Sequence, residues 1–114
     1  MLLLCMLDVR YYVAASGEEP FAEWFAGLDV AASAKIARAL ARMEQGNLSN
    51  VKSVGDGVLE YRIDFGPGYR IYFGRDGETI VVLLVGGTKK RQQRDIDAAR
   101  LYWQDYKRGK RGRS

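Results

Sequence analysis

Two arginines lie on neighbouring runs of the sequence in which charged and apolar residues alternate. Arg62 and Asp64 alternate with apolar residues in the first run, and Arg70 and Tyr72 do the same in the second. A guanidinium group can bind two oxygens of one phosphate through parallel hydrogen bonds, so two arginines on one sheet face suit a phosphodiester ligand. Residues 85–94 contain no acid and four more cations: Lys89, Lys90, Arg91 and Arg94. If folding brings these side chains together, they predict a site for a polyanion.

The alternation in this region predicts an antiparallel β-meander within residues 51–93. Gly66-Pro67-Gly68 and Asp76-Gly77 are tight-turn sequences, and they separate three strand-like runs. The third run, residues 80–85, is apolar without alternation, so we expect it to be covered on both faces. We expect the charged side chains of the first two strands to lie on an exposed face of the sheet.

Counting outward from the turns gives a predicted register for the meander. With a three-residue loop at Gly66-Pro67-Gly68, residues equidistant from Pro67 face each other, and the same counting applies across Asp76-Gly77. Three pairs result: Asp64 opposite Arg70, Arg62 opposite Tyr72, and Leu84 opposite Tyr69. The chain then leaves the third strand beside the first turn, which places the basic cluster that begins at Lys89 near the two arginines.

Four further elements are predicted around the meander. A strand candidate spans residues 4–13, and a short helix with proline at its first position spans residues 20–28. Asp29 suits the N-cap of a second helix over residues 30–45, and a last helix is predicted over residues 91–106. This order predicts an α+β fold in which helices cover one face of an antiparallel sheet.

Length and composition indicate one domain with an uneven distribution of charge. The chain has 114 residues, of which 47% are hydrophobic, so we expect a single domain over residues 1–106. Residues 107–114 hold five of the 18 basic residues and no acid, and we expect them to form a flexible tail. The remaining body has 13 basic and 14 acidic residues, so a polyanion site depends on where its cations gather.

The scarcity of cysteine and histidine limits the chemistry that is expected. The chain has one cysteine, Cys5, and no histidine, so it has no intramolecular disulfide and lacks the usual metal ligands. We therefore expect neither a metal nor a cofactor. The N-terminal MLLLC has no basic n-region and is too short for a signal peptide, so we expect a cytoplasmic protein without membrane attachment. Either Met1 or Met6 could be the native start.

Four segments of the chain carry a resemblance to a known family: PFAEWFAGL, GNLSNVKSVGDGV, YRIDFGPGYRIYF and IVVLLVGGTKKRQQRDI. Over residues 6–103 the chain resembles toxins of the RelE/ParE superfamily, and most closely the phage-derived HigB-like branch, the addiction module killer proteins. The most specific part is GPGYR-x-YF followed by LL-x-GG-x-K-x-x-Q-x-x-DI. The resemblance implies a RelE-like, microbial-RNase-like antiparallel sheet with an N-terminal helical hairpin and a C-terminal helix.

The resemblance also implies a function and partners. Such toxins of type II toxin-antitoxin modules are small endoribonucleases (mRNA interferases) that cut mRNA in the ribosomal A site and so inhibit translation. A cognate antitoxin, in the HigB-like branch a helix-turn-helix protein, neutralises each toxin, and the complex binds operator DNA. Proteins on the ParE side share the fold but inhibit DNA gyrase without nuclease chemistry. Gyrase is therefore an alternative target for this chain. A degenerate toxin acting mainly as an operon regulator is a third possibility.

RNA cleavage by a 2′-hydroxyl needs a base, an acid and stabilisation of the pentavalent phosphate. In a chain without histidine, the candidates for proton transfer are Lys52, Asp64, Tyr69, Tyr72 and Lys89. The resemblance places Arg70 on the arginine that follows Gly-Tyr, Arg62 on a basic residue of the preceding strand, and Lys89 or Lys90 after the last strand. Asp64 replaces a second basic residue of the family pattern, and the early C-terminal helix lacks the tyrosine of some relatives.

These considerations give a predicted set of site residues. The predicted catalytic residues are Arg62, Arg70, Lys89 and Lys52. The predicted RNA-binding residues are Lys90, Arg91, Tyr72, Asp64 and Arg94. Simpler structural roles stay open: a plain ion pair between Asp64 and Arg70, stacking of Arg62 on Tyr72, and a solvated loop and helix start over residues 89–94.

Overall fold

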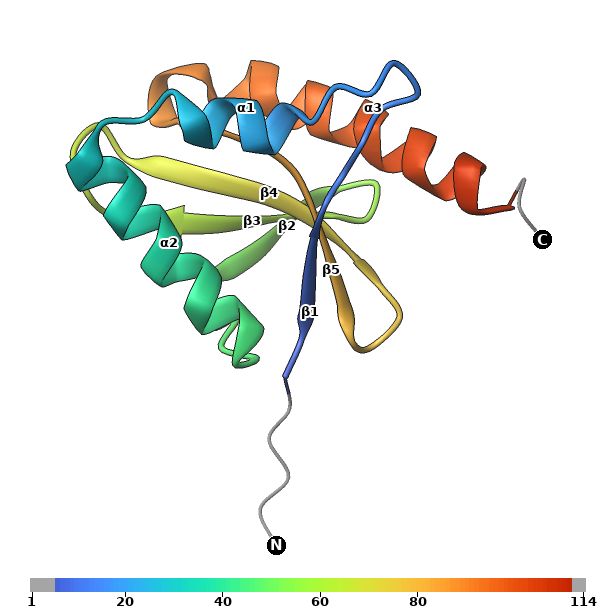
Figure 1. Ribbon diagram of the computed structural model, residues 1–114, viewed down its shortest axis with the longest axis horizontal. Helices are drawn as coiled ribbons and strands as arrows, with labels where there is room; N and C mark the ends of the chain where they lie inside the picture. Colours follow the sequence, from blue (N-terminus) through green and yellow to red (C-terminus); the bar gives the residue numbers. More distant parts are fainter. Residues whose placement is uncertain (1–5, 112–114) are drawn as a thin grey trace, which may run out of the picture.

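A five-stranded mixed sheet forms the middle layer of the molecule (Figure 1). The computed structural model describes residues 6–111, so Cys5 and the alternative start at Met1 lie outside the described residues. The sheet has the order β1-β5-β4-β3-β2. Its strands are β1 (Asp8–Tyr11), β2 (Val51–Gly55), β3 (Val58–Ile63), β4 (Tyr69–Asp76) and β5 (Ile80–Thr88). Strands β2 to β5 form the antiparallel meander, whereas β1 runs parallel to β5 at the edge.

The helices begin close to the positions that the sequence predicts. They are α1 (Pro20–Ala26), α2 (Val30–Glu44) and α3 (Gln92–Arg111), with a short 3-10 helix η1 (Lys89–Arg91) before α3. Asp29 caps α2 as predicted, because its side chain accepts a hydrogen bond of 2.8 Å from the backbone N–H of Ala32. Helix α3 continues five residues beyond the predicted end at Tyr106, so the first part of the expected tail is helical. No helix within residues 6–111 is long and apolar enough to cross a membrane.

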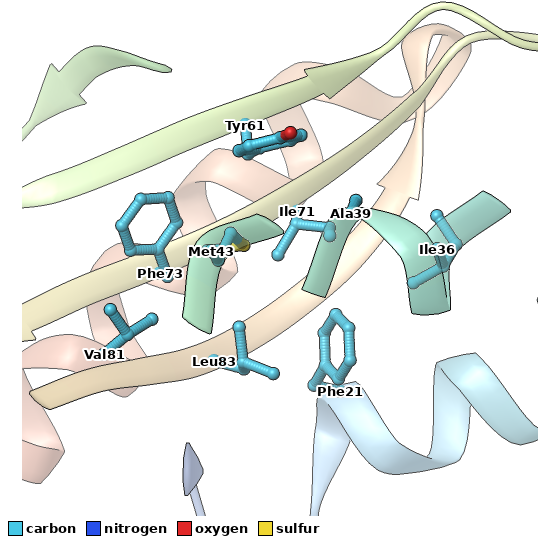
Figure 2. Close-up of a cluster of buried hydrophobic side chains, with 9 residues drawn as sticks. All are labelled: Phe21, Ile36, Ala39, Met43, Tyr61, Ile71, Phe73, Val81 and Leu83. Atoms are coloured by element: carbon cyan, nitrogen blue, oxygen red, sulfur yellow. The ribbon is translucent and has the colours of Figure 1, made fainter. Parts of the chain in front are cut away.

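Helices cover both faces of the sheet, which corrects the expected arrangement on one face. Helices α1 and α2 pack on the first face around Phe21, Ile36, Ala39, Met43, Tyr61, Ile71, Phe73, Val81 and Leu83 (Figure 2). Helix α3 packs on the second face around Tyr12, Val58, Tyr72, Val82, Leu84, Ile96, Ala99 and Trp103. Helices α1 and α3 overlap in the view of Figure 1 although they pack on opposite faces. Strand β5 is therefore buried on both faces, as its apolar sequence predicts.

The second core changes the environment of the charged sheet face. The exposed fractions are 0% for Glu60, 4% for Arg70 and 0% for Tyr72, although the alternation predicted an exposed face. Alternation reports which residues share a face, but a helix from a distant part of the chain decides whether that face is solvated. Here α3 covers it.

The meander register differs from the predicted one by two residues. Arg62 pairs with Arg70, and Glu60 pairs with Tyr72, so Asp64 does not face Arg70 and Arg62 does not face Tyr72. The loop between β3 and β4 has five residues, 64–68, and closes through a hydrogen bond of 3.0 Å from Gly68 N–H to the Phe65 carbonyl. A shift of two residues leaves every side chain on its own face, so alternation cannot detect it.

The pairing of β4 with β5 also differs from the prediction. Tyr69 lies opposite Thr88 rather than Leu84, and a β-bulge interrupts the ladder between Tyr72 and Phe73. The bulge accounts for one residue of this four-residue difference, and the rest arises because the β4–β5 loop consists of residues 77–79 rather than of Asp76-Gly77. The edge strand β2 was also missing from the three predicted strands. It is joined to β3 by a tight turn in which Asp56 has φ 56° and Gly57 has φ 84°.

Candidate active site

A cleft of about 620 Å³ opens where β3 ends and β4 begins, at the end of the sheet on the left of Figure 1. The four predicted catalytic residues, Lys52, Arg62, Arg70 and Lys89, all line it. The other lining residues are Asn50, Val51, Ile63, Asp64, Gly68 and Tyr69. The fold thus brings cations from four separate segments to one opening.

Each cation of the cleft is carried by a different part of the sheet. Lys52 comes from the edge strand β2, Arg62 from β3 and Arg70 from β4, and Lys89 follows β5. The backbone N–H of Lys89 donates a hydrogen bond of 2.8 Å to the carbonyl of Gly68. This bond joins the start of η1 to the β3–β4 loop and holds the two sides of the cleft together.

Arg70 is the most buried of the cleft cations. Its Nε lies 3.6 Å from Oε2 of Glu60, and an Nη1 hydrogen bond of 3.4 Å reaches the carbonyl of Gly68. Lys52, Arg62 and Lys89 are exposed. Because Arg70 is held on two sides and still lines the cleft, it presents a positive group whose position is largely set by the protein.

Glu60 is a site component that the sequence analysis did not single out. Its carboxylate is fully buried, and Oε2 accepts a hydrogen bond of 2.8 Å from Nε2 of Gln92 at the start of α3. The Nζ of Lys52 lies 3.8 Å from Oε1. Two cations and an amide donor therefore surround this buried charge, which would otherwise be strongly unfavourable. The sequence feature that could have pointed to Glu60 is a glutamate between two hydrophobic residues, Leu59 and Tyr61, within a predicted strand.

Tyr72 lies behind the cleft and does not line it. It is fully buried under α3, opposite Glu60 in the neighbouring strand. Burial, followed by the negative charge of Glu60, raises the pKa of Tyr72 well above its ordinary value. The phenol therefore keeps its proton at neutral pH. Its place in the structure is the second core, so it does not line the cleft near which its contact with RNA is predicted.

The remaining predicted RNA-binding residues fall into two groups. Asp64 lines the cleft from the β3–β4 loop, and no ion pair is formed by it within residues 6–111. Lys90, Arg91 and Arg94 are exposed but do not line the cleft.

At the start of α3, burial raises the pKa of Asp95, and the charges of Arg91 and Arg94 counteract this rise. The negative charge of Asp95 in the first turn of α3 offsets the unfavourable cations at that helix start.

The cleft is suited to bind and polarise a phosphodiester. Its guanidinium and ammonium groups can neutralise phosphate oxygens, while Asp64 supplies a carboxylate in the same opening. In the part of the chain that the structure describes, no three His, Cys, Asp or Glu side chains gather in a group that could hold a metal ion.

Comparison with known proteins identifies the family of the chain. A protein of Haemophilus influenzae, described as uncharacterized, is 42% identical over 86 residues, which cover 75% of this chain and 87% of that protein. Residues 23–106 match the family model described as phage-derived protein Gp49-like (DUF891), and this range includes all the residues that line the cleft. The chain therefore belongs to the phage-derived Gp49-like family.

Proposed function

We propose that this protein is the toxin of a type II toxin-antitoxin module and acts as a ribosome-dependent endoribonuclease on mRNA. The observation that carries the proposal is the convergence of Lys52, Arg62, Arg70 and Lys89 on one cleft. Membership of a phage-derived family agrees with the phage-derived HigB-like branch that the sequence resembles. A cationic cleft with a carboxylate at its rim suits RNA cleavage better than it suits a purely structural role.

In the proposed reaction the RNA 2′-hydroxyl attacks the adjacent phosphorus. A bond forms between the 2′ oxygen and phosphorus, and the bond to the 5′ oxygen of the next nucleotide breaks. The products are a 2′,3′-cyclic phosphate and a 5′-hydroxyl. Arg70 and Arg62 bind the non-bridging oxygens and stabilise the pentavalent phosphate. Asp64 accepts the proton of the 2′-hydroxyl, and the ammonium group of Lys52 or Lys89 protonates the leaving 5′ oxygen.

The proposed partner is a cognate antitoxin of the helix-turn-helix class. An acidic segment of the antitoxin can cover the cations of the cleft, or its bulk can prevent entry into the ribosome. The toxin-antitoxin complex, rather than the toxin alone, would bind operator DNA.

Mapping of cleaved mRNA in a purified translation system tests this function. The wild-type protein, Arg70→Ala and the control Arg10→Ala are compared by primer extension, with and without ribosomes. Arg10 is exposed on β1, at the other edge of the sheet from β2, and does not line the cleft. We expect cuts at fixed positions within A-site codons for the wild type and the control, and none for Arg70→Ala or without ribosomes. Intact mRNA with the wild type would reject the nuclease and turn attention to a gyrase supercoiling assay.

A further inference from the structure

A second, smaller hollow of about 180 Å³ lies beside the cleft on the side of α2. It shares four lining residues with the cleft: Asn50, Arg62, Ile63 and Asp64. Its opposite wall is formed by α2, which contributes Lys35, Arg38, Ala39 and Arg42. The two hollows are therefore neighbours with Arg62 in the wall between them.

The three cations of α2 form one row along the hollow. Lys35, Arg38 and Arg42 are spaced by three and four residues, which places them on the same face of the helix. All three are exposed, whereas Ala39 between them is buried in the first core. At the rise of an α-helix the row spans about 10 Å. This length is comparable with about three stacked nucleotides of a single strand.

The cations of this hollow lack carboxylate partners. Within residues 6–111, no ion pair involves Lys35, Arg38, Arg42 or Arg62. Cations at the far end of the molecule do pair with carboxylates: Arg10 with Asp8, Arg108 with Asp105, and Lys110 with Asp76. Uncompensated positive charge gathered in a hollow attracts an anionic ligand. The one acidic lining residue is Asp64.

Aromatic rings connect the hollow with the cleft. Phe65 lines the hollow and Tyr69 lines the cleft, and their rings stack with centroids 6.4 Å apart. Nζ of Lys35 lies 5.2 Å from the centroid of the Phe65 ring. Partly exposed rings beside a row of cations are the combination that binds single-stranded nucleic acid, because bases stack while phosphates pair. These rings favour RNA over an acidic protein segment as the occupant.

We propose that the hollow along α2 is a binding site for the single-stranded RNA that continues beyond the scissile phosphate. This inference rests on the proposed nuclease function and extends its substrate site. The strand passes from the cleft across Arg62, and its next phosphates lie against Arg42, Arg38 and Lys35. These side chains bind substrate without contacting the reacting atoms.

Binding of uncleavable RNA by the complete protein tests the inference. The probes are a trinucleotide and a dodecanucleotide with 2′-O-methyl groups, which block attack by the 2′ oxygen, and fluorescence anisotropy gives Kd over a range of salt concentrations. The variant combines Lys35→Gln, Arg38→Gln and Arg42→Gln. The matched control combines Arg10→Gln, Arg108→Gln and Lys110→Gln, which removes the same charge far from the hollow.

We expect the α2 variant to bind the dodecanucleotide more weakly and with a smaller dependence on salt. Loss of three phosphate contacts on a single strand lowers the slope of log K against log salt by about 2. If the trinucleotide occupies the cleft alone, as the inference requires, its Kd stays within about twofold of wild type because no contact with α2 is lost. The single variant Arg38→Gln is expected to lower the slope by about 0.7. The control is expected to retain the wild-type slope for both RNAs.

Several outcomes overturn the inference. They are undetectable dodecanucleotide binding by wild type, an unchanged slope in the α2 variant, or an equal change in the control. An α2 variant that binds RNA normally but loses its antitoxin would assign the hollow to a protein partner instead. Arg70→Ala separates the two claims. If Arg70→Ala weakens binding of both RNAs and the α2 variant weakens binding of neither, only the inference fails. Wild-type binding of both RNAs by Arg70→Ala would count against the proposed function itself.

Discussion

At the scale of single residues, the site depends on a carboxylate that no solvent reaches. Glu60 accepts a hydrogen bond from Gln92 and lies 3.6 Å from Nε of Arg70 and 3.8 Å from Nζ of Lys52. Because these groups surround one buried charge, we infer that the carboxylate helps to orient Arg70 and Lys52. Glu60 itself does not line the cleft, so it acts through Arg70 and Lys52 as a positioning residue.

Glu60→Gln is expected to reduce cleavage more than it reduces binding of RNA. The amide has nearly the same shape but no charge, so Arg70 and Lys52 lose the partner that orients them. A misplacement of about 1 Å can lower a rate by about 100-fold. We expect kcat in the translation assay to fall by up to about that factor, with a much smaller change in KM. Chemical denaturation would give the free energy of unfolding, which we expect to fall by about 1–3 kcal/mol.

The matched control for this variant is Glu78→Gln, in the exposed turn between β4 and β5. It makes the same chemical change away from the cleft and should leave kcat and KM at wild-type values. A Glu60→Gln protein that is folded and cleaves at the wild-type rate would show that Arg70 does not need the carboxylate.

The cations that line the cleft could be predicted from the sequence, but the buried Glu60 behind them could not. Arg62 and Arg70 stand on alternating strands and Lys89 follows the apolar third strand, and their residue types predict a phosphate-binding face. Glu60 shares the alternation of that face, so the pattern alone predicts one more exposed charge. Its burial depends on α3, which joins the sheet from the far end of the chain.

At the scale of elements, close contacts between α3 and the sheet hold the cleft residues in place. Gly87 in β5 lies against Asp95 in α3, and a Cβ at Gly87 would be 1.8 Å from the Asp95 carboxylate oxygen. Both residues are buried, so neither can move into solvent. Since η1 and Lys89 lie between Gly87 and Asp95 in the chain, the spacing of β5 and α3 also constrains the position of Lys89.

Gly87→Ala is expected to destabilise the protein by about 1–3 kcal/mol, because overpacking forces the helix away from the strand. The matched control is Gly109→Ala in the last turns of α3, where an added Cβ meets nothing within 4 Å. Alanine there should raise the free energy of unfolding by about 0.5–1 kcal/mol, since glycine is a poor helix former. Thermal and denaturant unfolding measure the change in the free energy of unfolding for both variants. Equal stability of Gly87→Ala and wild type would show that α3 is not held at this spacing.

The C-terminal half of α3 is attached to the sheet by a pH-sensitive contact. Asp76 accepts a hydrogen bond of 2.7 Å from the hydroxyl of Tyr106 and forms an ion pair with Lys110. The hydrogen bonds from Lys110 and then from Tyr106 lower the pKa of Asp76 below its ordinary value. The unfolded chain therefore binds a proton more readily than the folded protein, so this contact contributes stability at neutral pH that is lost as pH falls through the lowered pKa.

Asp76→Asn is expected to be less stable than wild type at neutral pH and equally stable in strong acid. The difference in the free energy of unfolding should shrink as the pH falls below the ordinary aspartate pKa of about 4. Denaturant titrations of both proteins at a series of pH values measure it. A difference that stays constant with pH would contradict the assignment of this contact to the ionised carboxylate.

The elements also show what a sequence pattern can and cannot determine. Proline at the start of α1 and the Asp29 cap of α2 are local signals, and the structure confirms both. The register of β3 against β4 is not local, because a five-residue loop and a three-residue loop give the same alternation. Strand β2 is short and half polar, so its pairing with β3 becomes visible only when the sheet is assembled.

At the scale of the whole molecule, positive charge is concentrated rather than abundant. Outside residues 107–114 the chain has a net charge of −1, yet the cleft and the neighbouring hollow are lined by seven cations: Lys35, Arg38, Arg42, Lys52, Arg62, Arg70 and Lys89. Cations at the other end of the molecule are paired with carboxylates. This distribution concentrates positive potential at one end of the sheet without a strongly basic body.

The central claim is that this cleft cleaves RNA through the 2′-hydroxyl next to the scissile phosphate. The most direct test places on the ribosome an mRNA with a single 2′-deoxy nucleotide at the mapped cleavage position, beside the same mRNA with ribose there. We expect wild-type protein to cut the ribose mRNA and leave a 2′,3′-cyclic phosphate end, and to leave the deoxy mRNA intact. Arg70→Ala should cut neither. Cleavage of the deoxy mRNA, or wild-type cleavage by Arg70→Ala, would contradict the claim.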